Sequence, residues 1–451
     1  MLYEHQIAGI DFLKNGGGCL FWEVGTGKTL TVIETFKRYR ENHPYVKLLV
    51  ICPISLIENA WATDIKKFSS FSYCNMRKAI TFADIYIVNY EVAITKTRWE
   101  NLRRLLNLGE FICCLDESSR IKSYNATTTK KLLLIRGMFK KRIVMSGTPC
   151  PNNELELWSQ ICFTSPGLLP ENFFQFRNQY FELQRGKQRL PARTLDKNTM
   201  SKLFGQGWSW GIDPAKKKDL MDKIAPKCMW VLKKDCLDLP EEIDEVRTIE
   251  LPDDMWKTYS QMREDCITEI SGEHIVAQIA LTKLMKLRQI GSGFSITPDG
   301  TIVKFPHNPK LTELLAALNE IGNNQVIIWT NFRQESRDIK EVLDSTRLDG
   351  ETVDRDQVIQ DFISGKIKYL IADKRSVAHG LTFTNCAYQI FYSLDYSAEL
   401  YQQARGRTHR AGQTRACVYI HLIVKDTIDE LIMQVLEKKI DSQDIIRKMM
   451  E

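Results

Sequence analysis

Residues 19–29 have the sequence CLFWEVGTGKT, in which a short apolar run enters a loop with two glycines, and a helical pattern follows to about Arg40. A strand, a glycine loop and a helix in this order form the setting in which backbone N–H groups and a helix N-terminus hold phosphate groups. Lys28 would supply a positive charge there, and the hydroxyl of Thr29 can ligate Mg²⁺. The strict phosphate-loop pattern has glycine where Trp22 stands, so the prediction depends on the strand and the helix as well as on the loop.

Apolar runs alternate with helical segments beyond this loop, which predicts an α/β layer with a parallel sheet. The runs cover residues 47–52, 84–89, 111–115 and 142–145. The third run ends in Asp116 and Glu117, and the carboxyl ends of parallel strands are where such sheets bind ligands. Asp116 could hold Mg²⁺, and Glu117 could orient and deprotonate a water molecule. An acidic N-cap explains the same pair, but after a phosphate loop we prefer the metal and base roles.

The fourth run is followed by SGTP, residues 146–149, which could contact phosphate or form a plain turn. A second α/β series comes later in the chain and has no phosphate loop of its own. We expect helices at 310–321 and 335–343 and strands at 326–329, 369–372 and 389–392.

The second series ends in QARGRTHRAGQ, residues 403–413. Arg407 and Arg410 are three residues apart, so they would project from about one face of a helical turn. The planar, always charged guanidinium group suits a phosphoryl group in transfer. On its own the segment is more typical of an arginine-rich surface turn, and it is the phosphate loop near the other end of the chain that favours the first interpretation.

Between the two series, residues 185–234 contain 13 basic and four acidic residues, a local charge of +9 in a chain whose net charge is +6. Such a segment indicates an electrostatic footprint for nucleic acid or a solvated loop face. Trp208 and Trp210 within it could stack on bases, although packing in a core or hairpin is the commoner use of tryptophan. Further on, residues 294–305 (FSITPDGTIVKF) predict a β-hairpin around Pro-Asp-Gly.

The composition, with 43% hydrophobic and 26% charged residues, is that of a soluble globular protein, and 451 residues suit two or three domains. No apolar run has the length of a membrane span, and the first residues do not form a signal peptide. The 12 cysteines show no CxxC pair and no spacing of a zinc site. We therefore expect a reduced, cytoplasmic protein without a membrane partner.

The order of these segments resembles that of the Swi/Snf-like branch of the superfamily-two DNA helicases and translocases. The resemblance extends from Leu2 to about Ile432, and the joint order is specific although each segment alone is not. The segments that carry it are LYEHQIAGIDFL (2–13), GTGKT (25–29), LLVICPISLIENAW (48–61), LDES (115–118), SGTP (146–149), VLKKDCLDLP (231–240), LMKLRQI (284–290), AHGLTFTNC (378–386) and QQARGRTHRAGQ (402–413).

This resemblance implies an α/β fold of two RecA-like lobes with parallel sheets, which bind ATP and Mg²⁺ between them. A basic helical insertion on lobe one and a β-hairpin at the lobe junction complete the expected fold class. The expected domains are 1–163 (lobe one), 164–232 (basic helical insertion), 233–305 (helical junction with the hairpin 294–305) and 306–451 (lobe two).

The resemblance also implies roles for single residues. ATP and metal binding is expected at Gln6, Gly25, Thr26, Gly27, Lys28, Thr29, Asp116 and Gly380, with Gln6 on adenine and Thr29 and Asp116 on the metal. Catalysis is expected to depend on Lys28, Asp116, Glu117, Gln403, Arg407 and Arg410, the two arginines acting as fingers. Phosphate contacts to nucleic acid, which are sequence-independent and salt-sensitive, are expected at Pro53, Ser55, Arg120, Lys122, Thr330, Asn331, Arg333, Thr382 and Thr384.

Three positions depart from the family's pattern. Ser119 stands where a histidine usually follows the acidic pair, which concerns the coupling of the lobes rather than hydrolysis. Trp22 replaces a residue that is usually acidic. Residues 378–386 differ from the family's fuller AGGxGxNLxxA text.

No bromodomain-like, chromodomain-like or zinc module is visible, and the chain resembles compact phage and bacterial members of the family. We therefore expect a monomeric motor for branched DNA, which drives branch migration or fork remodelling with limited unwinding. It would act in a bacterial or phage-infected cell, with replication or recombination proteins as candidate partners. The alternative is a double-strand DNA translocase that displaces proteins without separating strands. An RNA motor and a DNA-binding protein with an inactive ATP site are disfavoured.

Overall fold

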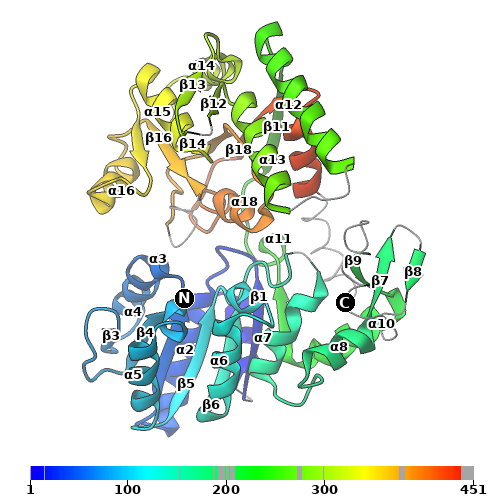
Figure 1. Cartoon of the computed structure of the whole chain (residues 1–451). Coiled ribbons are helices and arrows are strands. Elements are labelled where there is room, and N and C mark those ends of the chain that lie inside the picture. Colours follow the sequence, from blue (N-terminus) through cyan, green and yellow to red (C-terminus); the bar gives the residue numbers. More distant parts are fainter. Residues whose placement is uncertain are drawn as a thin grey trace. The chain divides into compact units, whose positions relative to one another are not determined.

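The computed structural model describes residues 2–14, 16–151, 153–185, 188–190, 199, 203, 209–271, 277–297, 299–374 and 381–437. The chain forms two compact units, and the boundary between them lies after Leu237. Each unit contains its own sheet with helices around it (Figure 1). No helix of the described residues is both long enough and apolar enough to cross a bilayer.

Unit 1 is built on a seven-stranded sheet in the order β10-β1-β6-β5-β2-β4-β3, and all its neighbouring strands are parallel. The strands are β1 Gly17–Trp22, β2 Lys47–Cys52, β3 Tyr73–Asn75, β4 Ile85–Asn89, β5 Phe111–Asp116, β6 Phe139–Met145 and β10 Cys228–Val231. The predicted run at residues 47–52 is β2 with the same bounds, and the predicted runs at 84–89, 111–115 and 142–145 are β4, β5 and β6.

Both faces of this sheet are covered, which explains why its strands are continuous apolar runs rather than alternating ones. In β2, Leu49 and Ile51 belong to the core on one face, whereas Leu48 and Val50 belong to the core on the other. The helices of unit 1 that complete these layers are α1 Glu4–Leu13, α2 Lys28–Asn42, α3 Ile54–Leu56, a π-helix η1 Ile57–Ala62, α4 Thr63–Phe68, α5 Lys96–Leu106, α6 Thr127–Ile135 and α7 Leu157–Thr164.

The segment after α7 is less helical than the sequence predicts. It contains a three-stranded antiparallel sheet in the order β8-β7-β9 between two helices. These elements are α8 Phe173–Tyr180, β7 Phe181–Arg185, β8 Gln188–Leu190, β9 Ser209–Ile212 and α10 Pro214–Ile224. The next strand, β10, falls within the predicted insertion 164–232 but pairs with β1 in the main sheet, because its apolar residues extend that sheet by one strand.

Unit 2 contains a six-stranded parallel sheet in the order β11-β18-β17-β14-β16-β15. Its strands are β11 Glu242–Ile249, β14 Val326–Thr330, β15 Thr346–Leu348, β16 Tyr369–Asp373, β17 Tyr388–Phe391 and β18 Cys417–Val424. Its helices are α12 Asp253–Ser271, α13 Ala277–Gly291, α14 Pro309–Ile321, α15 Arg333–Val342, α16 Arg355–Ile363 and α18 Ala398–Arg405.

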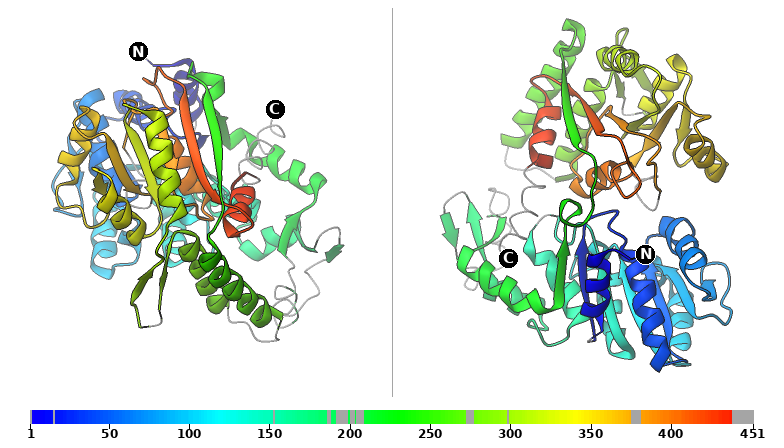
Figure 2. Two further views of the ribbon diagram at one scale, coloured as in Figure 1. Left: turned by 90° about the horizontal axis from the view of Figure 1, so that it is seen from above. Right: turned by 180° about the vertical axis from the view of Figure 1, so that it is seen from behind.

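The predicted hairpin is present as β12 Phe294–Ile296 and β13 Ile302–Lys304, which pair antiparallel. Its base is attached to unit 2, because the buried Phe294 packs edge-on against Phe332 at 5.7 Å and Lys304 forms ion pairs with Asp338 and Glu341 on α15. Its other end extends away from the sheet of unit 2 in the left-hand view of Figure 2. The hairpin therefore has a fixed base and a projecting tip.

Candidate nucleotide and nucleic-acid site

The loop between β1 and α2 has the backbone of a phosphate cradle. Gly25 and Gly27 have φ values of 92° and 83°, the left-handed region that glycine adopts without strain. Lys28, the first residue of α2, donates from Nζ to the carbonyl oxygens of Trp22 and Glu23 at 2.7 and 3.0 Å. The lysine side chain thus lies back across its own loop, at the N-terminus of a 15-residue helix. A helix N-terminus attracts anions, which is compatible with the predicted phosphate binding.

Two residues of α1 contact this loop. His5 Nε2 lies 2.8 Å from the carbonyl oxygen of Thr26, and Gln6 Nε2 donates to the carbonyl oxygen of Gly27 at 3.5 Å. A Cβ added at Gly27 would lie 2.1 Å from Gln6 Nε2 and would displace this amide, and the φ of 83° itself favours glycine. The structure therefore brings the predicted adenine-recognition residue Gln6 to the predicted phosphate loop.

Trp22 stands where the strict phosphate-loop pattern has glycine and where the resembled family usually has an acidic residue. In this structure it has a packing role. Its side chain is fully buried and lies over Gly9 of α1, where a Cβ would be 2.6 Å from the indole ring. Its ring also meets the His5 ring edge-on at 5.2 Å. The tryptophan thus packs α1 against β1. Gly25 and Gly27 provide the residues with positive φ in the loop.

Asp116 is the last residue of β5, as the sequence predicts, and its carboxylate is buried. Its Oδ2 accepts from Trp61 Nε1 and its Oδ1 from the backbone N–H of Glu117, both at 2.9 Å. Burial raises the pKa of the carboxyl group, against the opposing effects of the Trp61 hydrogen bond and of the Lys28 charge. Glu117 has φ 51° and ψ 57°, a left-handed conformation that is rare for a residue with a side chain and is often found at functional sites.

Trp61 and Gln160 are site residues that sequence reasoning missed. Trp61 lies in the π-helix η1, an element that often occurs at functional sites. Gln160 on α7 accepts from Ser118 Oγ at 2.6 Å and donates to the carbonyl oxygen of Pro149, also at 2.6 Å. No local signal could have found either of them, because each acts on a partner from a distant part of the chain.

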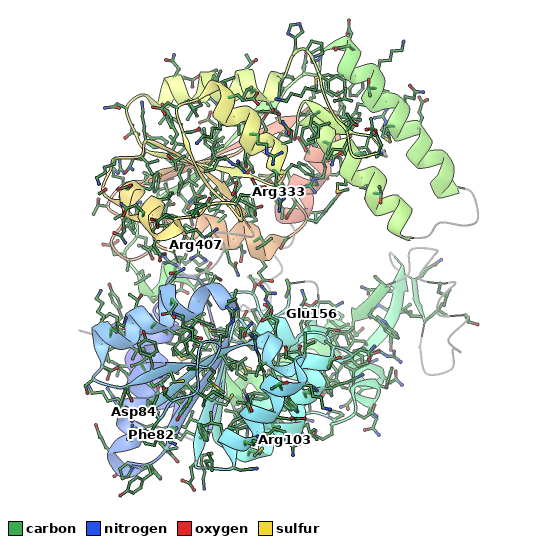
Figure 3. All side chains as sticks on the ribbon, turned by 60° about the vertical axis from the view of Figure 1, so that its left-hand side comes forward. Phe82, Asp84, Arg103, Glu156, Arg333 and Arg407 are labelled. Atoms are coloured by element: carbon green, nitrogen blue, oxygen red, sulfur yellow. The ribbon has the colours of Figure 1, made fainter. Side chains whose placement is uncertain are left out.

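The predicted finger segment follows α18 in unit 2, where Arg407 is labelled in Figure 3. Arg407 Nη1 and Arg410 Nη1 both donate to the carbonyl oxygen of Leu381, at 2.9 and 3.3 Å. Arg410 also donates to the Thr382 hydroxyl. Gln403 is buried, and its Nε2 donates to Glu399 at 3.3 Å. The structure therefore joins both predicted fingers to residues 381–384, which include the predicted nucleic-acid contacts Thr382 and Thr384.

The remaining residues of that segment are placed in part. Thr384 lies beside Gly412, where an added Cβ would be 3.8 Å from the threonine hydroxyl. Gly380, predicted to bind the nucleotide, lies outside the described residues, as does Trp208.

The predicted nucleic-acid residues differ in how accessible they are. Thr330 is 1% exposed and its hydroxyl lies 2.8 Å from that of Ser336, while Asn331 Nδ2 donates to Ser393 at 2.9 Å. The side chain of Arg333, labelled in Figure 3, is 73% exposed and lies 3.4 Å from Glu351. Arg333 can thus reach a phosphate without rearrangement, whereas Thr330 and Asn331 would have to give up these bonds.

In unit 1 the corresponding residues follow β2 and β5. Pro53 is buried and Ser55 half-buried, at the start of α3. Arg120 is exposed, and Lys122 lies 3.7 Å from Glu156. These residues all follow the carboxyl ends of their strands, and strands of a parallel sheet end at one common edge.

The donors present fit ATP and a hard divalent cation. Gly27 and the first residues of α2 offer backbone N–H groups to phosphates, and Lys28 offers a charge. The hydroxyl of Thr29 and the carboxylate of Asp116 are the oxygen donors that Mg²⁺ prefers. The fit rests on this chemistry and on the buried carboxylate at the end of β5.

Comparison with known proteins places the chain in a family. Residues 5–292 match the SNF2-related domain, and residues 308–412 match the helicase conserved C-terminal domain. The chain therefore belongs to the SNF2-related family, and its class is that of the ATP-dependent helicases and translocases, as the sequence predicts.

Individual relatives are distant. Protein p41 of Acyrthosiphon pisum secondary endosymbiont phage 1 is 26% identical over all of this chain and 98% of its own length. An uncharacterized ATP-dependent helicase of Mycoplasma genitalium is 25% identical over 99% of this chain, which spans 42% of that relative. The solved SWI2/SNF2 ATPase core of Sulfolobus solfataricus in complex with double-stranded DNA is 24% identical, with a TM-score of 0.44 over 97% of this chain and 91% of its own.

Proposed function

We propose that this protein is an ATP-driven motor that moves along duplex DNA and remodels branched DNA, with limited strand separation. The hairpin β12–β13, with its anchored base and projecting tip, is the observation that favours branched DNA. The motor itself rests on the two half-sites described above and on membership of the SNF2-related family.

In the ATP half-site, Gln6 would recognise adenine and Lys28 would bind the phosphates. Thr29 and Asp116 would hold Mg²⁺, which supplies charge neutralisation to the phosphates when bound. Glu117 would orient the attacking water and take its proton. Its left-handed backbone distinguishes Glu117 from Asp116, the proposed metal ligand, which ends the strand β5.

In the second half-site, Arg407 and Arg410 would stabilise the charge that develops on the transferring phosphoryl group. Both arginines donate to the Leu381 carbonyl, and Arg410 also to Thr382. Movement of the fingers during the ATP cycle would therefore move the segment 381–384, which we propose to contact DNA. This is a direct physical link between hydrolysis and the grip on DNA.

The segment after α7 is proposed as a second, electrostatic grip. Arg177 on α8 lies with its guanidinium carbon 4.3 Å from the ring centre of Trp210 and 5.1 Å from that of Phe174, whose side chain is 48% exposed. Proteins that bind single-stranded nucleic acid combine aromatic rings, arginine side chains and a positively charged surface, and this segment contains all three. Packing in the core of unit 1 explains Trp210 as well, because its ring contacts that core.

The hairpin is proposed as the wedge that meets the branch point. Its turn is internally bonded, since Thr297 N donates to the carbonyl oxygen of Thr301 at 2.9 Å and Thr301 Oγ1 donates to Asp299 at 2.9 Å. Ile302 and Val303 on β13 are 39% and 50% exposed, so the hairpin presents apolar side chains to its surroundings. A stiff turn with exposed aliphatic residues suits insertion at a fork.

A double-strand translocase without strand separation is the second candidate. The small size of the hairpin favours it, because two three-residue strands make a short wedge. In that case the hairpin would only brace α15 through Lys304.

The test is ATP hydrolysis by the wild type and by Glu117→Gln with single-stranded, linear duplex, forked and four-way-junction DNA. Strand products are followed in the same reactions. We expect DNA-stimulated hydrolysis by the wild type and a loss of roughly 10²-fold or more in kcat for Glu117→Gln. Junction-specific products that disappear in Glu117→Gln support the branched-DNA motor. Equal stimulation by linear duplex without strand products supports the translocase, and no hydrolysis with any DNA refutes the motor.

A second variant separates the two candidates. Deleting residues 297–301 and joining the strands with a short glycine linker should leave DNA-stimulated hydrolysis intact and abolish junction processing. Lys304→Met is the matched control, because it releases the base from α15 but keeps the tip. Junction processing that survives the deletion would contradict the wedge.

A further inference from the structure

Gln160 is a fully buried polar side chain that joins two loops of unit 1. It lies on α7, and its Oε1 accepts a hydrogen bond from Ser118 Oγ at 2.6 Å. Its Nε2 donates to the carbonyl oxygens of Pro149 at 2.6 Å and of Glu156 at 3.0 Å. The orientation of the amide is dictated by chemistry, because the two carbonyls can only accept and therefore require the NH₂ group.

Each of the two loops carries residues of the ATP half-site or lies against it. Ser118 directly follows Glu117, the residue with φ 51°. Pro149 ends the SGTP segment, and a Cβ added at Gly147 in that segment would lie 3.0 Å from the side chain of Val24 in the phosphate loop. Gln160 thus ties the turn that bears the proposed base to a segment that touches the phosphate loop.

The conformation of Glu117 needs such support. A residue with a Cβ adopts the left-handed region only where its surroundings hold it there. Around Glu117 the backbone N–H donates to Asp116 Oδ1 at 2.9 Å, and its carbonyl oxygen accepts from Arg120 N at 3.0 Å. Both of these bonds are local, within three residues. The bond between Ser118 and Gln160 connects the turn to another element, 42 residues away.

We propose that Gln160 is a positioning residue, which acts through Ser118 to hold Glu117 in the conformation that orients the attacking water. This inference rests on the proposed function, in which Glu117 is the base. A glutamine suits the task because one side chain offers both the acceptor that Ser118 needs and the donors that Pro149 and Glu156 need. An apolar side chain of the same size would remove the buried acceptor of Ser118 Oγ and the side-chain donor to the Pro149 carbonyl.

A positioning role and a purely stabilising role of Gln160 predict different effects of its substitution. A residue that only stabilises unit 1 would, on substitution, lower the unfolding temperature and the active fraction, but folded molecules would keep their kcat. A positioning residue lowers kcat of the folded enzyme, because a base that is misplaced by a fraction of a bond length orients water poorly. Nucleotide affinity stays, because Gln6, Lys28 and Thr29 are untouched.

The experiment compares Gln160→Met, Ser118→Ala and the double variant in the full chain. Three quantities are measured: kcat for DNA-stimulated ATP hydrolysis, the Kd of a fluorescent ATP analogue with Mg²⁺, and the unfolding temperature. We expect a loss of roughly 10- to 100-fold in kcat for Gln160→Met, with the Kd changed by no more than about twofold. Ser118→Ala should lose activity similarly, and the double variant should be little worse than either single variant.

Two further variants sharpen the test. Gln160→Glu keeps the acceptor for Ser118 and, as a protonated carboxylic acid in this buried position, one donor for Pro149, so we expect a smaller loss of kcat than for Gln160→Met. Thr164→Val is the matched control on the same helix, because it removes a buried hydroxyl that bonds to the Gln160 and Ile161 carbonyls, both at 3.2 Å, without touching Ser118. We expect it to keep its kcat.

Unchanged kcat in folded Gln160→Met, or losses from Gln160→Met and Ser118→Ala that multiply in the double variant, would overturn the positioning role. Failure of the proposed function would look different, because the wild type itself would then hydrolyse no ATP with any DNA.

Discussion

At the scale of single residues, His421 on β18 is a buried histidine whose environment requires the neutral ring. Its ring stacks on Phe391 with centroids 5.0 Å apart, and its Nε2 lies 2.8 Å from the Tyr401 hydroxyl. Burial is the main cause that lowers the pKa of His421 from 6.5 to about 4, with Asp244 opposing and Arg405 adding to the shift. The stability that this histidine contributes is therefore present above pH 6.5 and lost as the pH falls towards 4.

We predict that His421→Phe makes the free energy of unfolding less dependent on pH below about pH 7. The phenyl ring keeps the stack on Phe391 but cannot bind a proton. Between about pH 7.5 and about pH 5 the wild type should lose about 2 kcal/mol of unfolding free energy more than the variant does, as a folded-state pKa of about 4 implies. Equilibrium unfolding in denaturant at the two pH values measures the difference, and parallel profiles for the two proteins would contradict the neutral, buried histidine.

Residues whose chemistry is local could be predicted from the sequence, and residues that act across the fold could not. Lys28 and the Asp116–Glu117 pair were found because a glycine loop or an apolar run adjoins them. Trp61 and Gln160 were missed because their partners, Asp116 and Ser118, lie 55 and 42 residues away. Their hydrogen bonds to Asp116 and Ser118 form only when the fold brings η1 and α7 next to the end of β5.

At the scale of elements, the edge strand β11 is held by the helix that precedes the finger segment. Arg405, the last residue of α18, donates to both carboxylate oxygens of Asp244 at 2.7 and 3.0 Å and lies over the Tyr419 ring at 4.0 Å. His409 Nε2 lies 2.9 Å from the carbonyl oxygen of Pro240, just before the strand. The first residues of unit 2 are thus fastened to the segment that carries Arg407.

We predict that Arg405→Met loosens the start of β11. The loss of a two-pronged charged contact should cost about 1 kcal/mol, a modest value because Asp244 is partly exposed and screened by solvent. Amides of residues 242–246 should exchange faster with deuterium in hydrogen-exchange mass spectrometry. In a double-mutant cycle with Asp244→Asn the two changes should be non-additive.

A control for this prediction exists at the opposite end of the same strand. Lys425 pairs with Glu250 at 3.4 Å, and both side chains are largely exposed, so Lys425→Met should leave exchange in β11 unchanged. Equal exchange in Arg405→Met and the wild type would mean that backbone pairing with β18 alone holds the strand.

Elements were predictable where one pattern fills a contiguous stretch. The strands β2, β4, β5, β6, β14, β16 and β17 were found as apolar runs. The strand β18 is not among the predicted strands, although CVYIHLIV is a continuous β-forming run. The strand β10 lies inside a basic segment and pairs with β1 more than 200 residues away, so only the assembled sheet identifies it. The antiparallel strands β7 and β9 are short and separated by about 20 residues, which hides the pairing.

At the scale of the whole molecule, the residues predicted to bind ATP and the predicted arginine fingers lie in different units. Among the residues that the structure describes, the hydrophobic clusters of unit 1 are built from residues before Leu237 and those of unit 2 from residues after it. The predicted nucleotide-binding residues Gln6, Lys28 and Asp116 lie in unit 1, whereas Arg407 and Arg410 lie in unit 2. Binding and hydrolysis of ATP should therefore be separable by cutting the chain at the boundary.

We predict that residues 1–237 fold on their own and bind a fluorescent ATP analogue with Mg²⁺. Their sheet is complete in this segment, because its last strand is β10, and both of its faces are covered by helices of the same unit. Hydrolysis should be slower than in the full chain by roughly 10³-fold or more, because the proposed fingers Arg407 and Arg410 are absent.

The full-length Arg407→Ala and Arg410→Ala variants are the matched controls. Their nucleotide affinity should resemble that of the isolated unit 1, and their kcat should fall towards its value, since each lacks a finger in an otherwise complete chain. A fragment 1–237 that hydrolysed ATP at the rate of the full chain would remove unit 2 from the chemistry. In that case the role of Arg407 and Arg410 would be structural. They would hold Leu381 and Thr382 through the hydrogen bonds already present within unit 2.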